Sequence, residues 1–231
     1  MNAWFITATD TDAGKTFVTA GLLRAFARAS FDSLGFKPVA SGCELTEQGL
    51  RNEDVLRLMA ASSVKIAYEQ VNPYVFEPAI APHIAAEKAG KNINLNQIVS
   101  NIQENSIKSD IILVEGVGGW QVPLNSTQTI ADLAQQLAYP VILVVNMRLG
   151  CINHALLTVQ SIAQSGLELA GWVANTGAVQ PMTRLQENIA TLKQWIKAPL
   201  LAELPELKEN DSAYTDVFDL MLCRLPDKNF Q

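Results

Sequence analysis

The chain is poor in the residues that bind zinc and form disulfide bonds. Its 231 residues include two histidines, His83 and His154, and three cysteines far apart in the sequence with no C-x-x-C pair, Cys43, Cys151 and Cys223. So few histidines argue against a histidine-rich zinc site. A sparse, odd set of cysteines indicates reduced thiols in a cytosol, packed as small hydrophobic side chains. We therefore expect a cytoplasmic protein without disulfide bonds.

An excess of basic residues and a long apolar run are also missing. Seventeen Lys and Arg stand against 23 Asp and Glu, which gives a formal net charge of −6 and a pI of about 5.0. This acidic balance argues against nucleic acid or an anionic membrane as a partner. The apolar run at 141–145 has the length of a strand, and no basic region followed by an apolar signal segment opens the chain. The sequence therefore predicts neither a membrane span nor a secretory signal.

What the chain does contain is an alternation of strand-sized and helix-sized segments. It is 48% hydrophobic, which with its length is enough for a large core. The runs at 111–114 and 141–145 are continuously apolar, which is typical of strands covered on both faces. The residues from 70 to 82, with three prolines, predict an irregular surface excursion. Strands are predicted at 3–7, 34–37, 111–115, 141–146, 169–175 and 200–202, and helices at 17–29, 54–61, 96–105, 130–138, 153–165, 184–196 and 213–222.

The segment that follows the first predicted strand carries a phosphate-binding pattern. Residues 7–16 read T-A-T-D-T-D-A-G-K-T and lead into a predicted helix. The N–H groups and the dipole of a helix start favour an anion there. Lys15 can reach terminal phosphates, and the Thr16 hydroxyl can bind a phosphate-bound Mg²⁺. Because Thr9 stands where the strict pattern has its first glycine, the loop is a variant. Residues 1–231 thus predict one α/β domain of the P-loop NTPase type, with a doubly wound, mainly parallel sheet and helices on both faces.

Chemistry-bearing residues also follow other predicted strands. Glu115 ends an apolar strand before G-V-G-G, where it is a candidate Mg²⁺ ligand or else a strand-ending carboxylate before a flexible turn. Lys37 precedes Pro38, and a proline favours extended backbone at the residue before it. A lysine at this strand end would project its cation into the crevice at the strand ends. Two lysines on different loops indicate an anionic substrate or intermediate besides the nucleotide. Asp54 by itself indicates no more than an acid at a helix start.

Four blocks of the sequence resemble dethiobiotin synthetases in the same order. Residues 9–16, 35–42, 113–119 and 149–154 read T-D-T-D-A-G-K-T, G-F-K-P-V-A-S-G, L-V-E-G-V-G-G and L-G-C-I-N-H. The likeness continues at 171–175 and 198–201 and runs from about residue 3 to 205. It departs from the family pattern at Ala8, Asp12 and Thr176, where the family tends to have Gly, Glu and Asp.

The resemblance implies an ATP-dependent cyclo-ligase of biotin biosynthesis, with its active site at a homodimer interface. The substrates would be 7,8-diaminononanoate, CO₂ (or bicarbonate) and ATP with Mg²⁺. One amine would add to CO₂ to give a carbamate, which would take the γ-phosphoryl group of ATP. The second amine would then close the ureido ring as phosphate leaves.

Residue roles follow from the resemblance by position. Lys15 and Thr16 would serve the phosphates and Mg²⁺, and Asp54 and Glu115 would complete the metal site. The amines and the carbamate would face Thr11, Lys37 and Ser41, with Gly118 beside the diamine. A helix start that contains Gly150, Cys151 and Asn153 would hold the substrate carboxylate from the neighbouring subunit. Asn175 would read the adenine, and further nucleotide contacts are implied for Asp12, Ala13, Gly14, Phe17, Gly116, Val117, Thr176, Leu204, Pro205 and Glu206.

Two other functions compete with this interpretation. A switch ATPase that controls partner proteins tends to carry an extra lysine early in the phosphate loop, and residues 9–13 contain none. An amidoligase of the cobyrinate type usually joins a glutaminase domain with a Cys nucleophile, for which 231 residues leave no room. Stoichiometric ATP use that depends on the diamine and CO₂ would separate the three.

Overall fold

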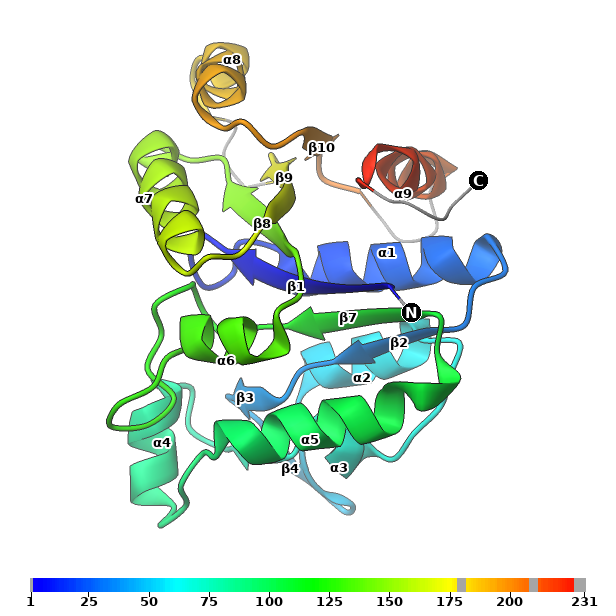
Figure 1. The fold of residues 1–231 in the computed structure, drawn as a ribbon, viewed down its shortest axis with the longest axis vertical. Coiled ribbons are helices and arrows are strands. Elements are labelled where there is room, and N and C mark those ends of the chain that lie inside the picture. Colours follow the sequence, from blue (N-terminus) through cyan, green and yellow to red (C-terminus); the bar gives the residue numbers. More distant parts are fainter. Residues whose placement is uncertain (1, 178–181, 208–211, 227–231) are drawn as a thin grey trace.

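The centre of the molecule is a six-stranded sheet in the order β10-β9-β8-β1-β7-β2, in which every neighbouring pair is parallel (Figure 1). The structure is a computed structural model, and it describes residues 2–177, 182–207 and 212–226. The strands of this sheet are β1 (Asn2–Ala8), β2 (Ser33–Phe36), β7 (Ile111–Glu115), β8 (Val141–Asn146), β9 (Leu169–Asn175) and β10 (Leu200–Leu204). Two small sheets pair β3 (Val39–Ser41) with β6 (Tyr74–Phe76) and β4 (Glu44–Thr46) with β5 (Gly49–Arg51).

Helices cover both faces of the sheet, which confirms the predicted doubly wound α/β fold. Along β1, Trp4 and Ile6 face one core and Phe5 faces the other, because successive side chains of a strand point to opposite faces. One face carries α1 (Lys15–Arg28), α2 (Glu53–Ala61) and α9 (Ser212–Arg224). The other carries α5 (Leu95–Asn105), α6 (Ile130–Leu137), α7 (Cys151–Gln164) and α8 (Leu185–Trp195). The connection from β5 to α5 contains α3 (Tyr68–Val71) and α4 (Pro82–Lys88), and a 3₁₀ turn, η1 (Ser106–Lys108), follows α5.

The predicted strands at 111–115, 141–146 and 169–175 coincide with β7, β8 and β9. The predicted strand at 34–37 is displaced by one residue, since β2 runs from Ser33 to Phe36. The Lys37 N–H leaves the sheet and donates to Val71 O at 3.2 Å, and the following Pro38 has no N–H with which to continue a ladder. The side chain of Lys37 therefore lies just past the strand end.

Two expectations about irregular structure and cysteine burial were wrong in part. The stretch at 70–82 is not irregular throughout, since it contains β6 and the first residue of α4. That first residue is Pro82, and a proline is tolerated in the first turn of a helix. A three-residue strand between prolines carries too little periodicity to be recognised. Cys43 and Cys151 are buried as expected, but Cys223 is exposed on α9.

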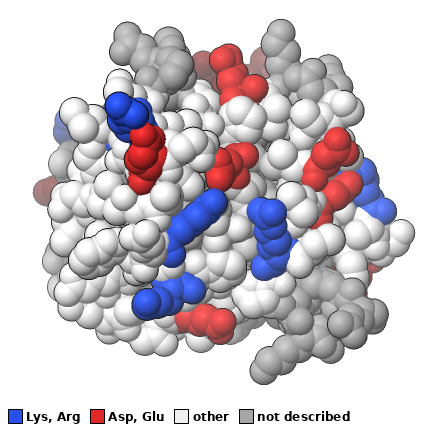
Figure 2. All heavy atoms as spheres, turned by 90° about the horizontal axis from the view of Figure 1, so that it is seen from above, with Lys and Arg blue, Asp and Glu red and all other residues white. Residues whose placement is uncertain are grey.

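The surface carries both charge signs. Figure 2 shows the face that lies at the top of Figure 1, and there basic side chains are interspersed with acidic ones. Among the described helices, none combines the length and the apolar character that crossing a membrane requires.

Candidate active site

The loops at the carboxyl ends of the parallel strands surround a cavity of about 690 Å³. Because all six strands run in the same direction, these loops gather at one edge of the sheet. The cavity is lined by Thr11, Asp12, Gly14, Lys15, Thr16, Phe17, Lys37, Ser41, Gly42, Asn52, Asp54, Arg57, Ala79, Val117 and Gly118. Three of the four family-like blocks, 9–16, 35–42 and 113–119, thus contribute to one space, together with residues 52–57 and Ala79.

The phosphate loop turns into α1 at Gly14, which precedes the first helical residue, Lys15. Gly14 has φ +92°, and a Cβ atom there would lie 2.4 Å from Asn175 Nδ2. Both the backbone conformation and the available space therefore require glycine. Asp12 also has a positive φ of +56°, which is uncommon for a residue with a side chain. Gly14, Lys15 and Thr16 at the start of α1 all line the cavity, and the N–H groups of a helix start favour an anion.

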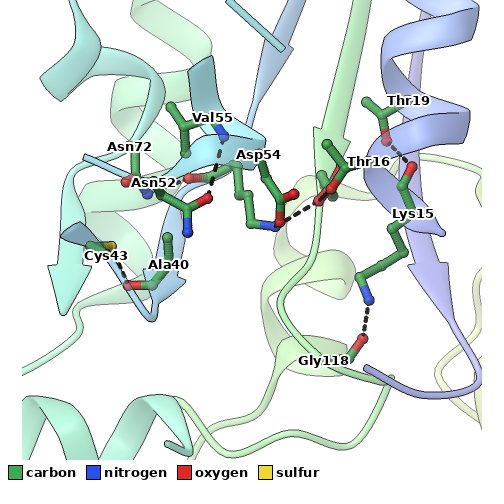
Figure 3. Close-up of polar contacts among 12 residues, drawn as sticks. Lys15, Thr16, Thr19, Ala40, Cys43, Asn52, Asp54, Val55, Asn72 and Gly118 are labelled. Atoms are coloured by element: carbon green, nitrogen blue, oxygen red, sulfur yellow. Dashed lines mark hydrogen bonds and ion pairs between the residues drawn. The ribbon is translucent and has the colours of Figure 1, made fainter. Parts of the chain in front are cut away.

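Lys15 crosses from α1 to the loop that follows β7. Its Nζ donates to Gly118 O at 2.7 Å and to Asp10 O at 3.4 Å, and Figure 3 shows the side chain extended toward Gly118. Burial lowers the pKa of Lys15 more than the attraction of the Glu115 carboxylate raises it. The buried side chain of Lys15 therefore joins the phosphate loop to the loop that follows β7.

A second group of charges lies at the end of β7. Glu115 is completely buried, and its Oε1 accepts from Thr16 Oγ1 at 2.7 Å and from Lys37 Nζ at 2.8 Å. Asp54, in the first turn of α2, accepts from Lys37 Nζ at 2.5 Å. Burial raises the pKa of Asp54, but the charge of Lys37 and its hydrogen bond outweigh this and lower it. We call these four side chains the buried cluster: Thr16, Lys37, Asp54 and Glu115.

The oxygen atoms of the buried cluster fit a phosphate-bound Mg²⁺. Glu115 Oε2 is buried and makes no hydrogen bond to any part of the chain that the structure describes. Within that described part of the chain, no group of three His, Cys, Asp or Glu side chains lies close enough together to hold a metal ion by itself. Mg²⁺ is usually bound through one or two carboxylates together with substrate phosphates and water, so Thr16, Asp54 and Glu115 suit it without a complete protein cage.

Lys37 is held both at its ammonium and at its backbone. Burial opposes its charge, but the attraction of Glu115 and Asp54 and their hydrogen bonds outweigh burial and raise the pKa of Lys37. Asn72 Nδ2 donates to Lys37 O at 2.5 Å, and Asn72 Oδ1 accepts from the Tyr68 hydroxyl at 3.1 Å. No pattern in the sequence indicated Asn72, which is 35 positions away from Lys37. Lys37 is therefore a fixed, protonated group.

Ser41 and Thr11 line the cavity, and each carries a hydroxyl group. Ser41 Oγ is buried and has no hydrogen-bond partner within residues 2–177, 182–207 and 212–226, whereas Thr11 is exposed. A buried hydroxyl without a partner is costly, unless a ligand completes it. Gly118 lines the same space with φ +64°.

The residues predicted on the adenine side lie together beside the phosphate loop, outside the lining of the cavity. Asn175 Nδ2 donates to Ala13 O at 2.9 Å, and Asn175 Oδ1 accepts from the Gly177 N–H at 3.2 Å. Among the residues that the structure describes, these two bonds leave the amide one N–H and one lone pair for a ligand. Thr176 donates to Leu204 O through its N–H at 2.7 Å and its hydroxyl at 3.0 Å. These contacts join the loops after β9 and β10, which contain Pro205 and Glu206, and the nucleotide role of the group stays a prediction.

The predicted carboxylate segment is the start of α7, and it too lies outside the cavity lining. The helix begins at Cys151, two residues earlier than predicted, after Gly150 with φ +95°. Cys151 is buried, whereas Gly150 and Asn153 are exposed and Leu149 is 94% exposed. An exposed helix start suits a ligand that comes from outside this chain.

Several lining residues were missed from the sequence. Asn52 caps α2, since its Oδ1 accepts from Val55 N at 3.3 Å, and an asparagine before an acidic helix start was a usable signal. Arg57 lies one turn after Asp54 and pairs with Glu53 at 2.6 Å. Gly42 and Ala79 also line the cavity and carry no signal of that kind.

The comparisons with known proteins agree with the four blocks. A family model described as an AAA domain matches residues 2–213. The chain is 53% identical over 211 residues to an ATP-dependent dethiobiotin synthetase BioD of Pseudomonas aeruginosa (strain UCBPP-PA14), covering 90% of this chain and 92% of that protein. It is 52% identical over 224 residues to the enzyme of that name from Cellvibrio japonicus, with 95% and 97% covered. It is 46% identical over 213 residues to the enzyme of the same name from Marinobacter nauticus, covering 92% of this chain and 91% of that protein.

Solved structures with much lower identity share the fold. The septum site-determining protein MinD of Pyrococcus horikoshii, complexed with Mg-ADP, superposes with a TM-score of 0.59 at 18% identity over 95% of this chain and 93% of that chain. The signal recognition particle receptor FtsY of Elizabethkingia anophelis, in complex with GDP, gives 0.52 at 10% identity, over 98% and 64%. At such identities the likeness shows the fold alone.

Proposed function

The chain belongs to the dethiobiotin synthetase family, and from that premise we propose that it is an ATP-dependent cyclo-ligase. The reaction proposed is the formation of dethiobiotin from 7,8-diaminononanoate and CO₂ in biotin biosynthesis, with release of ADP and phosphate. The observation that carries the proposal is the buried cluster, which sets a second lysine beside the phosphate loop in the same cavity. A nucleotide switch has no evident use for Lys37, whereas a reaction through anionic intermediates does.

Binding of the phosphates would use the start of α1. The N–H groups that follow Gly14 favour an anion, and Lys15 would exchange its contact with Gly118 O for the terminal phosphates. Thr16, Asp54 and Glu115 would hold Mg²⁺, which supplies positive charge against the phosphates.

Ring formation would proceed in three steps. An amine nitrogen attacks the carbon of CO₂ and loses a proton, which gives a carbamate. A carbamate oxygen then attacks the γ-phosphorus, and ADP leaves. The second amine attacks the activated carbonyl carbon, and phosphate leaves as the second C–N bond closes the ring and the amine gives up a proton.

Side chains in the cavity would position and stabilise these groups. Lys37 is kept protonated by Asp54 and Glu115, so it acts as a fixed cation near the carbamate and the migrating phosphoryl group rather than as a base. The unpartnered Ser41 hydroxyl and the exposed Thr11 hydroxyl would orient the amines and the carbamate.

The remaining contacts extend the proposal beyond the cavity. Asn175 would read the adenine while it braces Ala13, and the start of α7 would hold the carboxylate of substrate bound in the neighbouring subunit. Leu149 and Leu157, 94% and 58% exposed, support a homodimer interface around α7. Residues 1–231 would act as one domain in the cytoplasm.

The test is product formation by the purified protein. Dethiobiotin detected by mass, together with phosphate release that requires ATP, the diamine and CO₂, is the expected result. ATP hydrolysis without the diamine would favour the switch ATPase, and glutamine-dependent amidation would favour the amidoligase.

A further inference from the structure

Asp10 and Arg148 link the phosphate loop to the start of α7. Arg148 Nη2 donates to Asp10 Oδ2, and Asp10 Oδ1 accepts from the Thr11 N–H at 2.8 Å. On the other side, Arg148 O accepts from the N–H of Cys151, the first residue of α7, at 2.9 Å. One arginine therefore contacts both segments, through its side chain and its backbone.

Other hydrogen bonds hold the same part of the loop. Thr9 Oγ1 accepts from the Asn146 N–H at 3.3 Å, at the end of β8. Asp10 O accepts from Lys15 Nζ at 3.4 Å. The backbone then reaches Asp12, whose positive φ is unfavourable unless its surroundings hold it. The contacts of Asp10 lie immediately before this strained position.

The Asp10–Arg148 ion pair is half exposed, since 45% of the Asp10 side chain and 50% of the Arg148 side chain are accessible. Ion pairs of this exposure contribute little to stability, because water and salt screen them. Removing this ion pair should therefore leave the stability of the fold nearly unchanged, so an altered position of the loop can be measured apart from unfolding.

We propose that the Asp10–Arg148 pair is a positioning device that fixes Thr11 relative to the start of α7. The diamine part of this inference rests on the proposed function, in which Thr11 faces the reacting amines. Arg148 holds Asp10, Asp10 holds the backbone of Thr11, and the front of the phosphate loop stays in register with α7. The pair touches no reacting atom, so both residues are positioning residues.

The kinetic test uses a double-mutant cycle with Arg148→Gln and Asp10→Asn, because asparagine can still accept from the Thr11 N–H. Each single variant is expected to lower kcat/KM for the diamine about tenfold while the Kd for ATP stays within about twofold, since small misplacements of a positioned group cost rate. The double variant should be no worse than either single variant. Arg148→Lys should recover most of the activity.

The matched control is Arg28→Gln, which removes a comparably exposed ion pair, Arg28–Asp219, between α1 and α9. It should leave kcat/KM unchanged. Additive losses in the cycle, or equal losses of diamine and ATP binding, would overturn the proposal.

Hydrogen–deuterium exchange on the free protein tests the device without any substrate. Arg148→Gln should speed exchange in a peptide that covers residues 8–16, and Arg28→Gln should not. If exchange responds but the wild-type protein makes no dethiobiotin, the device stands and the proposed function fails. If the wild-type protein makes dethiobiotin but Arg148→Gln leaves both exchange and kcat/KM unchanged, the device is refuted.

Discussion

The buried cluster and the exposed edge of the same cavity each contain a basic side chain, but in different surroundings. Lys37 has a side-chain exposure of 7% and two carboxylate partners, whereas Arg57 lines the same cavity at 51% exposure and pairs with Glu53 along one helix. A charge that is shielded from water acts on its neighbours through a low effective dielectric, and an exposed one is screened. Between Lys37 and Arg57, burial rather than the presence of a cation should therefore decide which charge acts strongly on the reacting groups.

Lys15→Ala should have the largest effect, with turnover abolished. The variant removes a buried cation at the start of α1 that no other side chain of the loop replaces. Diamine-dependent phosphate release measures it, with thermal unfolding as the check that the chain still folds. Near-normal ring closure by this variant would exclude the phosphate-loop assignment.

Lys37→Gln should bind ATP nearly normally and form product about 10²–10³ times more slowly, because a contact that strengthens as charge develops is lost from a water-poor site. Nucleotide affinity and diamine-dependent phosphate release are measured on the same preparation. Loss of both in equal measure would indicate a folding or phosphate-loop defect instead. Loss of neither would remove Lys37 from the mechanism.

Asp54→Asn and Glu115→Gln should raise the Mg²⁺ concentration needed for half-maximal rate by on the order of tenfold or more, since each removes a charged oxygen ligand. Mg²⁺ titrations at fixed ATP measure the shift. A changed pH profile with an unaltered Mg²⁺ requirement would instead favour proton transfer as the role of these carboxylates.

Arg57→Gln should have the smallest effect, a change in kcat/KM of about threefold or less that fades as salt is added. Rates at low and high ionic strength, beside those of Lys37→Gln, give the comparison directly. If Arg57→Gln proved as damaging as Lys37→Gln at both salt concentrations, burial would not be what separates the two regions.

The sequence predicted the parts of the molecule whose signal is local. The strands β7, β8 and β9 were recognisable because each is largely apolar along its length. A strand that is buried on both faces needs apolar side chains on both, so it shows in the sequence as a nearly continuous apolar run. Lys15 and Thr16 were placed at a helix start by a short pattern. The family resemblance added Asp54, which alone indicated only a helix terminus.

What the sequence did not predict depends on partners far apart in the chain. The support of Lys37 by Asn72, the contact of Asn175 with Ala13 and the Asp10–Arg148 pair join positions separated by 35 to 162 residues. Periodicity carries no information on such pairs, because they form only when the sheet order brings the loops together. The short strands β3 and β6 escaped for a related reason, since each is three residues long and pairs with the other across a long connection.

The buried cations of the site already have internal partners, which makes ligand binding an exchange rather than a simple addition. Lys37 is matched by Asp54 and Glu115, and Lys15 rests on a carbonyl oxygen. The cavity is thus close to electroneutral before any ligand enters, with Lys15 and Lys37 opposite Asp54 and Glu115. A nucleotide that arrives without a divalent ion brings negative charge to a balanced site, and a divalent ion that arrives alone competes with Lys37 for its carboxylates. Each should therefore bind more tightly when the other is present, and the two affinities are linked by the same factor.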